Sequence, residues 1–174
     1  MPIRIEKKED FQTTEDVIKQ AFKHAPYSDQ KEHGLVKRLR SSKEFIPELS
    51  LVYEDGGKIL GHILYTKVQL KNDTQSYEAL ALAPVSVLPS HQNLGIGKAF
   101  ITAGLEKAKE LNYKAVVVLG HPEYYPKFGF KKAALWGIKA PFEVPGELFM
   151  AMELQQDSLK GVQGIVEYSP AFFE

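Results

Sequence analysis

Apolar residues recur at helical spacing in three segments of the chain, which predicts three amphipathic helices. The first begins at Thr13 or Thr14, either of which can cap it, and runs to about residue 23. The second covers residues 31–42, with cationic side chains near its end as the helix dipole favours. The third, residues 97–111, shows the clearest separation of faces, so it is expected to pack on a core. Its apolar face consists of Ile101, Leu105, Ala108 and Leu111.

Between the second and third helices, the pattern changes to extended apolar runs separated by turn residues. Asp55-Gly56-Gly57 is a strong hairpin signal, and Asn72-Asp73 marks a second turn. Strands joined by such short turns form an antiparallel meander. Pro84 has no N–H to donate to a neighbouring strand, so we expect a bulge or a break in pairing there. The expected strands cover residues 3–6, 49–54, 59–70 and 77–88.

A continuous apolar run over residues 115–119 is typical of a buried parallel strand. Together with the preceding strand and helix, it makes residues 77–119 a βαβ crossover. Residues 26–30 are expected to form a turn, residues 133–147 a long ordered loop, and residues 148–154 a further strand. The fold class is therefore α/β (α+β). We predict one domain over residues 1–174, with a mixed central sheet and helices on both faces.

Composition excludes several classes of function. The formal net charge is zero, so no overall field attracts nucleic acid or an anionic membrane. The absence of cysteine excludes disulfides, thiolate nucleophiles and cysteine zinc sites. The histidines show no metal-ligand spacing, so no metal is expected. No apolar stretch approaches membrane-spanning length and no signal peptide is evident, which leads us to expect a cytoplasmic protein without a membrane partner.

The segment Gln92-Asn93-Leu94-Gly95-Ile96-Gly97 joins a predicted strand directly to the predicted helix 97–111. Unpaired N–H groups and the positive end of the helix dipole make such a junction an anion site, and the glycines allow a diphosphate to approach. The spacing excludes a P-loop, since one residue separates the glycines and Ala99 follows Lys98. It also excludes a dinucleotide fingerprint, because Phe100 stands where the third glycine would be.

This junction resembles motif A of the GNAT superfamily of acyl-CoA-dependent N-acetyltransferases, Gln/Arg-x-x-Gly-x-Gly/Ala, with Gln92, Gly95 and Gly97 at its defined positions. The run 125–130, Tyr-Pro-Lys-Phe-Gly-Phe, matches the Tyr-x-x-x-Gly-Phe segment of motif B. The resemblance covers roughly residues 1–132. The run 120–126, Gly-His-Pro-Glu-Tyr-Tyr-Pro, is similar to a bacterial subgroup of predicted acetyltransferases.

The resemblance implies acetyl-CoA as cosubstrate, with its diphosphate on the junction and its pantetheine arm against the strand that precedes it. In this family the arm inserts between two parallel strands that splay apart, and Pro84 is a plausible cause of the splay. The implied binding residues are Val85, Ser86, Val87, Gln92, Asn93, Leu94, Gly95, Ile96, Gly97 and Lys98.

For catalysis, the resemblance places the general acid that protonates the departing CoA thiolate at Tyr125, with Tyr124 as the alternative. His121 and Glu123 are both candidates for the general base, either directly or through water. Many family members carry an asparagine seven residues before the tyrosine. Val118 occupies that position here.

The implied function is transfer of acetyl from acetyl-CoA to a primary amine by direct attack in a ternary complex, since no cysteine can carry the acyl group. One alternative is a non-catalytic acyl-CoA-binding or sensing module, and another is an interaction domain that binds no CoA. The sequence does not distinguish a small-molecule amine from a peptide amine as the acceptor. It also does not distinguish a monomer from a homodimer.

Overall fold

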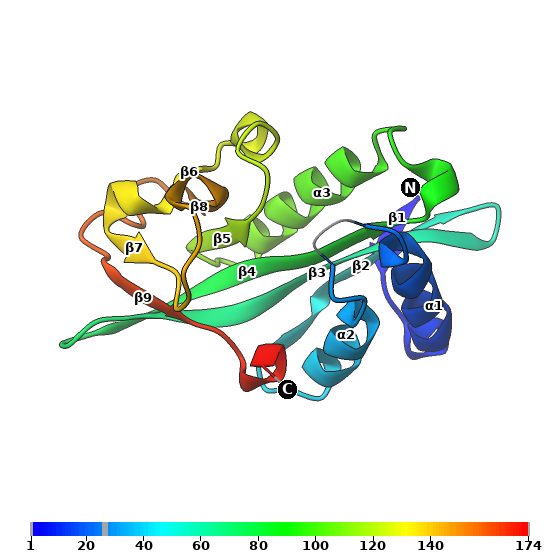
Figure 1. Ribbon diagram of the computed structural model, residues 1–174, viewed down its shortest axis with the longest axis horizontal. Helices are drawn as coiled ribbons and strands as arrows, with labels where there is room; N and C mark the ends of the chain where they lie inside the picture. Colours follow the sequence, from blue (N-terminus) through cyan, green and yellow to red (C-terminus); the bar gives the residue numbers. More distant parts are fainter. Residues whose placement is uncertain (1, 26–27, 174) are drawn as a thin grey trace.

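A computed structural model describes residues 2–25 and 28–173 of the chain. In the described residues, a twisted sheet of nine strands forms the centre, with α3 across one face and α1 and α2 across the other (Figure 1). The helices are α1 (Phe11–Phe22), α2 (Glu32–Arg40) and α3 (Ile96–Glu110). The strands are β1 (Ile3–Ile5), β2 (Phe45–Asp55), β3 (Lys58–Lys71), β4 (Ser76–Val87), β5 (Ala115–Leu119), β6 (Lys131–Lys132), β7 (Ile138–Lys139), β8 (Phe149–Glu153) and β9 (Gly164–Glu167).

The strands follow the order β1-β2-β3-β4-β5-β8-β6, and β9 pairs with both β3 and β7. Strands β2, β3 and β4 form the expected antiparallel meander, and β1 pairs antiparallel with β2 at the edge of the sheet. Strand β5 joins β4 in parallel through the crossover helix α3. The predicted fold class, with a mixed sheet and helices on both faces, is therefore confirmed.

The parallel pairing of β4 with β5 ends after two residue pairs, Leu80 with Val116 and Ala81 with Val117. Beyond this point β5 continues along β8 as far as Leu119, while β4 continues along β3 as far as Val87. The two strands therefore diverge, and their facing edges are not joined by ladder hydrogen bonds. We call this divergence the splay.

The break in pairing expected at Pro84 is confirmed. On β3, Ile63 pairs with Val85 and Tyr65 with Leu82, so Ala83 and Pro84 together oppose Leu64 alone. The Ala83–Pro84 peptide bond is cis. This bulge lies two residues past the last β4–β5 pair, next to the start of the splay.

Two buried layers hold the helices on the sheet. On one face, Phe100, Ile101 and Leu105 of α3 pack with apolar residues of β2 to β5 and β8, Leu80 and Val116 among them. On the other face, buried residues of α1 and α2 pack on β3 and on the C-terminal segment: Ile18, Val36, Leu39, Leu64 and Ala171.

The C-terminal third differs from the prediction. Residues 133–147 were expected to form a loop, but they contain a short 3-10 helix, Ala133–Trp136, and strand β7. Strand β9 was not anticipated, although the strand expected at 148–154 is present as β8. Strands of two to four residues are too short to show an alternation of apolar and polar residues. They are recognised only by the strands with which they pair. The turn expected at 26–30 includes residues 26 and 27, which lie outside the described residues.

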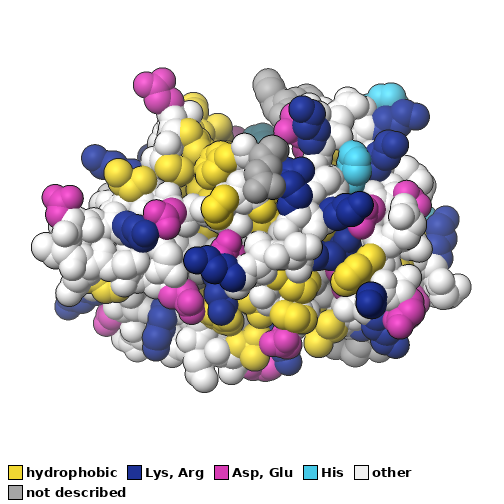
Figure 2. All heavy atoms as spheres, turned by 90° about the horizontal axis from the view of Figure 1, so that it is seen from below, with side chains coloured by type: hydrophobic (Ala, Val, Ile, Leu, Met, Phe, Trp, Pro, Cys, Tyr) yellow, Lys and Arg dark blue, Asp and Glu magenta, His cyan; other side chains and the backbone are white. Residues whose placement is uncertain are grey.

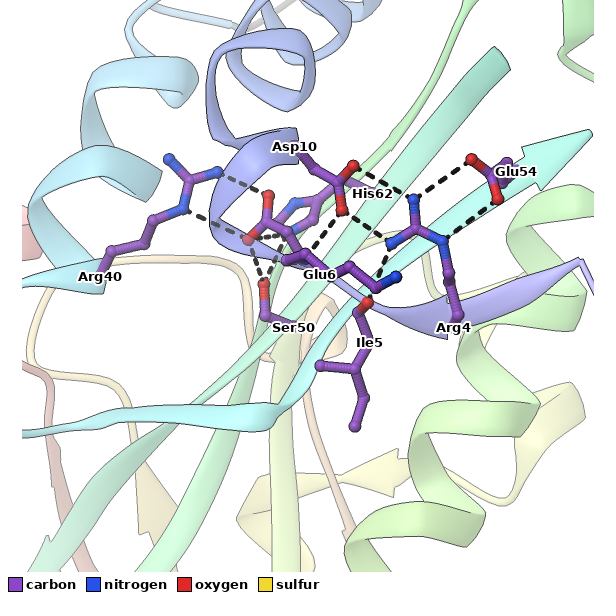
Figure 3. Close-up of polar contacts among 9 residues, drawn as sticks. Arg4, Ile5, Glu6, Asp10, Arg40, Ser50, Glu54 and His62 are labelled. Carbon is purple, nitrogen blue, oxygen red and sulfur yellow. Dashed lines mark hydrogen bonds and ion pairs between the residues drawn. The ribbon is translucent and has the colours of Figure 1, made fainter. Parts of the chain in front are cut away.

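A buried charged network fixes α2 against β1 and β2 (Figure 3). Arg40 Nη2 contacts Glu6 Oε2 at 2.7 Å, and both side chains are almost completely buried. Ser50 Oγ donates to Glu6 Oε1 at 2.9 Å and lies 2.9 Å from His62 Nε2. Because the Ser50 proton is committed to the carboxylate, His62 must donate from Nε2, which defines its neutral tautomer.

The surroundings shift the pKa values of both Glu6 and His62 in this network. Burial lowers the pKa of His62 to about 4, since a charged ring would be desolvated. Burial alone would raise the pKa of Glu6, but attraction to the His62 ring when it is protonated, and the hydrogen bond and charge of the Arg40 guanidinium, outweigh it, so that pKa is lowered. At neutral pH the network therefore holds an ionised carboxylate, a guanidinium and an uncharged imidazole.

We predict that the free energy of unfolding falls as the pH drops from 6.5 to about 4. The unfolded chain takes up a proton on His62 near pH 6.5, whereas the folded chain resists protonation until about pH 4. The loss attributable to His62 is roughly 3 kcal/mol. Urea unfolding across this range should show a shallower pH dependence for His62→Gln than for the wild type. The exposed His24→Gln should match the wild type, and equal slopes for all three proteins would contradict the prediction.

Candidate functional site

The junction between β4 and α3 is held in a sharply turned conformation. Gln92 Nε2 donates to the Val87 carbonyl at 3.1 Å, which ties the loop back to the end of β4. Asn93 and Gly95 both adopt left-handed backbone angles, with φ of 65° and 84°. Asparagine and glycine tolerate this region best, so these residue types suit the turn that leads into α3.

This turn leaves a row of backbone donors available at the start of α3. The first helical hydrogen bond runs from the Ala99 amide to the Gly95 carbonyl at 3.0 Å. Among the described residues, the amides of residues 93–98 have no hydrogen-bond acceptor. A Cβ added at Gly95 would meet nothing within 4 Å, so the space beside these amides is open. The unpaired N–H groups and the helix dipole together create a site for an anion.

The three candidate residues of β4 alternate between the two faces of the sheet. Val85 and Val87 are half-buried and pack with the core beneath α3. Ser86 is fully buried and lies opposite His62 on β3, so its side chain faces α1 and α2 instead. A ligand on the α3 side of the splay therefore meets Val85 and Val87 and only the backbone of Ser86.

The two adjacent tyrosines take different places. A Cβ built at Gly97 would lie 3.5 Å from the Tyr124 hydroxyl, which puts Tyr124 at the first turn of α3. The Tyr125 ring instead lies against Gly120 at the end of β5 and packs edge-to-face on Phe130, with centroids 5.7 Å apart. Burial, with a smaller effect of Tyr124, raises the pKa of Tyr125 to about 12, so this hydroxyl stays protonated at neutral pH.

His121 and Glu123 lie in the turn that carries these tyrosines, and both are exposed. The His121 carbonyl accepts hydrogen bonds from the Tyr124 and Tyr125 amides at 3.2 and 3.3 Å. Within the described part of the chain, neither the His121 nor the Glu123 side chain forms a hydrogen bond. The structure therefore brings all the catalytic candidates to one end of β5.

A cavity of about 270 Å³ lies at the splay, between the diverging ends of β4 and β5. Four aromatic residues of the C-terminal segment line it, and sequence reasoning did not single them out. The spacing of these aromatic residues along the chain matches no motif. They come together only because the C-terminal segment returns beside β3. Larger hollows of about 730 and 670 Å³ lie beside β9 and β7, away from the splay. The cavity is lined by Ala81, Leu82, Ala83, Val117, Val118, Leu119, Phe142, Tyr168, Phe172 and Phe173.

An open anion site, a splayed parallel strand pair and a tyrosine beside the strand end together define a class of protein. The acetyltransferase (GNAT) domain family matches residues 2–133, so the chain belongs to the GNAT acetyltransferase family. In the described residues, no helix is long and apolar enough to span a membrane. The same residues contain no cluster of three or more histidine, aspartate or glutamate side chains able to hold a metal ion.

Particular relatives support this assignment. The N-acetyltransferase YjhQ of Escherichia coli K12 is 38% identical over 118 residues, which span 67% of this chain and 65% of YjhQ. The E. coli GNAT family N-acetyltransferase YhbS, solved in complex with CoA, superimposes with a TM-score of 0.87 at 26% identity, covering 99% of this chain and 91% of YhbS. A GNAT family acetyltransferase from Brucella melitensis, solved with acetyl-CoA, gives a TM-score of 0.80 at 34% identity, covering 98% and 96% of the two chains.

Proposed function

We propose that this protein is an N-acetyltransferase that moves acetyl from acetyl-CoA to a primary amine in a ternary complex. The observation that carries the proposal is the splay together with the free amides of residues 93–98, which follow the diverging end of β4 in the chain. The solved YhbS and Brucella relatives, bound to CoA and acetyl-CoA, support acetyl-CoA as the cosubstrate.

The amides of residues 93–98 would bind the diphosphate of acetyl-CoA. Each negative charge gains about 0.3–1 kcal/mol from the helix dipole, in addition to the hydrogen bonds themselves. Gly95 and Gly97 leave room for the phosphates, and the exposed Lys98 adds a positive charge at the same end of α3. The unpaired edge of β4 at Val85 and Val87 would bind the pantetheine arm as an added strand binds a sheet edge.

The transfer exchanges one bond for another. The neutral amine nitrogen forms a bond to the thioester carbonyl carbon, the carbon–sulfur bond breaks, and the amine proton must leave while the CoA thiolate gains one. Tyr125 is the proposed acid because it lies at the end of β5 and its high pKa keeps it protonated. Tyr124 is instead placed at the first turn of α3, beside the proposed diphosphate site, which favours Tyr125.

His121 or Glu123 would accept the proton that the amine loses. An ammonium group of pKa about 10.4 costs roughly 4–5 kcal/mol to deprotonate at neutral pH, so a base is needed. Both side chains are exposed and lie in the same turn as Tyr125. A water molecule between the base and the amine would therefore carry the proton, because neither side chain is buried against the splay.

The proposed diphosphate site predicts that Asn93→Asp weakens acetyl-CoA binding. The substitution preserves the left-handed backbone but adds a negative charge beside the free amides. Repulsion of about 1 kcal/mol would raise the Kd roughly fivefold, and added salt would reduce the effect. Isothermal titration calorimetry measures this directly. Asn112→Asp is the matched control, because Asn112 is also left-handed and exposed but follows the opposite end of α3. Equal Kd values for both variants would contradict the site.

The proposed acid predicts that Tyr125→Phe lowers kcat by about 10²-fold while leaving the Kd for acetyl-CoA unchanged. The ring keeps its packing on Phe130, and only the hydroxyl is lost. The readout is release of the CoA thiol in the presence of an amine. Tyr113→Phe is the control, because Tyr113 follows the C-terminal end of α3. If Tyr125→Phe left kcat unchanged, the role of Tyr125 would be wrong. Acetyl-CoA binding without turnover of any amine by the wild type would favour a non-catalytic acyl-CoA-binding module.

A further inference from the structure

The cavity at the splay opens on the face of the sheet away from α3 and reaches into the gap between the strands, where Leu82 and Val118 of its lining belong to the layer beneath α3. Ala81 and Val117, which line it, belong to the buried layer that includes Phe149 and Ala151 and packs with Tyr168. Val85, Val87 and Tyr125, by contrast, pack with the layer beneath α3. The proposed acetyl-CoA site and the cavity therefore approach the same gap between β4 and β5 from opposite sides.

The walls of the cavity on this side are aromatic. The rings of Phe142 and Tyr168 are stacked with centroids 6.1 Å apart, and Phe172 packs on Tyr168 with centroids 5.1 Å apart. Phe142 and Phe173 remain 41% and 66% exposed, so the aromatic walls reach the surface. Figure 2, which views the molecule from the side of α1, α2 and the C-terminal segment, shows hydrophobic side chains at the surface among charged ones.

Among the described residues that line the cavity, none has a basic or carboxylate side chain. Tyr168 supplies the only side-chain hydroxyl among the described lining residues, and burial raises its pKa to about 12, which keeps it neutral. Among these described residues, a substrate with several positive charges would find no carboxylate to pair with, and a carboxylate on the substrate would find no cation. Both would lose hydration without compensation.

We infer that the cavity binds the acetyl acceptor, and that this acceptor is a small primary amine with an apolar, ring-sized body, such as an arylalkylamine. This inference rests on the proposed acetyltransferase function. The cavity of about 270 Å³ is at the lower limit for ligand pockets, which fits a single ring better than an oligosaccharide or a folded chain.

The position of the cavity explains how such an amine would reach the thioester. Ala83 and Leu119, at the diverging ends of β4 and β5, form the wall next to the splay. An acceptor whose ring packs against the aromatic walls would place its amino group toward the wall formed by Ala83 and Leu119. The low polarity of the cavity lowers the pKa of the ammonium, which assists deprotonation before attack.

The aromatic walls come from a part of the chain that the family match does not include. That match ends at residue 133, whereas Phe142, Tyr168, Phe172 and Phe173 all follow it. The C-terminal segment therefore adds acceptor specificity to a domain whose preceding residues carry the proposed acetyl-CoA site.

The test is an acceptor panel with the purified full chain, acetyl-CoA and a thiol readout for CoA release. The probes are 2-phenylethylamine, phenylalanine, which adds a carboxylate to the same body, and spermidine, a linear polycation. We expect kcat/KM for 2-phenylethylamine to exceed both others by at least tenfold. Phe142→Ala should raise its KM about tenfold without changing the KM for acetyl-CoA, because one aromatic wall is lost. Leu135→Ala, at a residue that is 69% exposed and outside the cavity, should change neither value.

Preferential turnover of phenylalanine or spermidine would overturn the inference and leave the acetyltransferase proposal standing. An unchanged KM for 2-phenylethylamine in Phe142→Ala would overturn it as well. Faster turnover of hexanoyl-CoA than of acetyl-CoA, lost in Phe142→Ala, would show that the cavity holds the acyl chain instead. Absence of acetyl-CoA binding by calorimetry would contradict the proposed function itself.

Discussion

The divergence of β4 and β5 is the constraint on which the site depends. Parallel pairing stops at Ala81 and Val117 because β5 follows β8 while β4, bulged at Pro84, follows β3. A buried sheet with an unpaired edge is costly unless another group supplies the missing partners. In the proposed function, a ligand with amide groups along its length supplies these partners, and the free amides at the start of α3 bind its anionic end.

The rest of the fold holds this gap open from both faces. On one side α3 is anchored by Phe100 and by the Tyr65 hydroxyl, which donates to the Ile101 carbonyl at 3.1 Å. On the other side the Glu6–Arg40 ion pair fixes α2 beside the strands. Because the helices are held by the sheet, the two sides of the splay form separate surfaces, one beneath α3 for the proposed cosubstrate and one among the C-terminal aromatic residues for the proposed acceptor.

The sequence contained enough information to predict the central fold and the proposed cosubstrate site. These features depend on residues that are near one another in the chain. They include the long periodic segment 97–111, the turn signal Asp55-Gly56-Gly57 and the spacing of Gly95 and Gly97. The cavity could not be predicted in this way. Tyr168 reaches Phe142 only because the short strand β9 pairs with β3, and a four-residue strand carries no periodic signal. The buried His62 likewise looked like one of several scattered histidines until pairing placed it near Ser50.

Hydrogen–deuterium exchange with and without saturating acetyl-CoA tests the central claim most directly, with binding verified by calorimetry in the same sample. If the cosubstrate occupies the splay, amides in peptides covering residues 83–98 should exchange more slowly in its presence, because β4 gains a partner and the start of α3 gains acceptors. The exposed turn at residues 55–58 should be unaffected. Bound acetyl-CoA that leaves residues 83–98 unprotected, or that protects only a distant segment, would contradict the account.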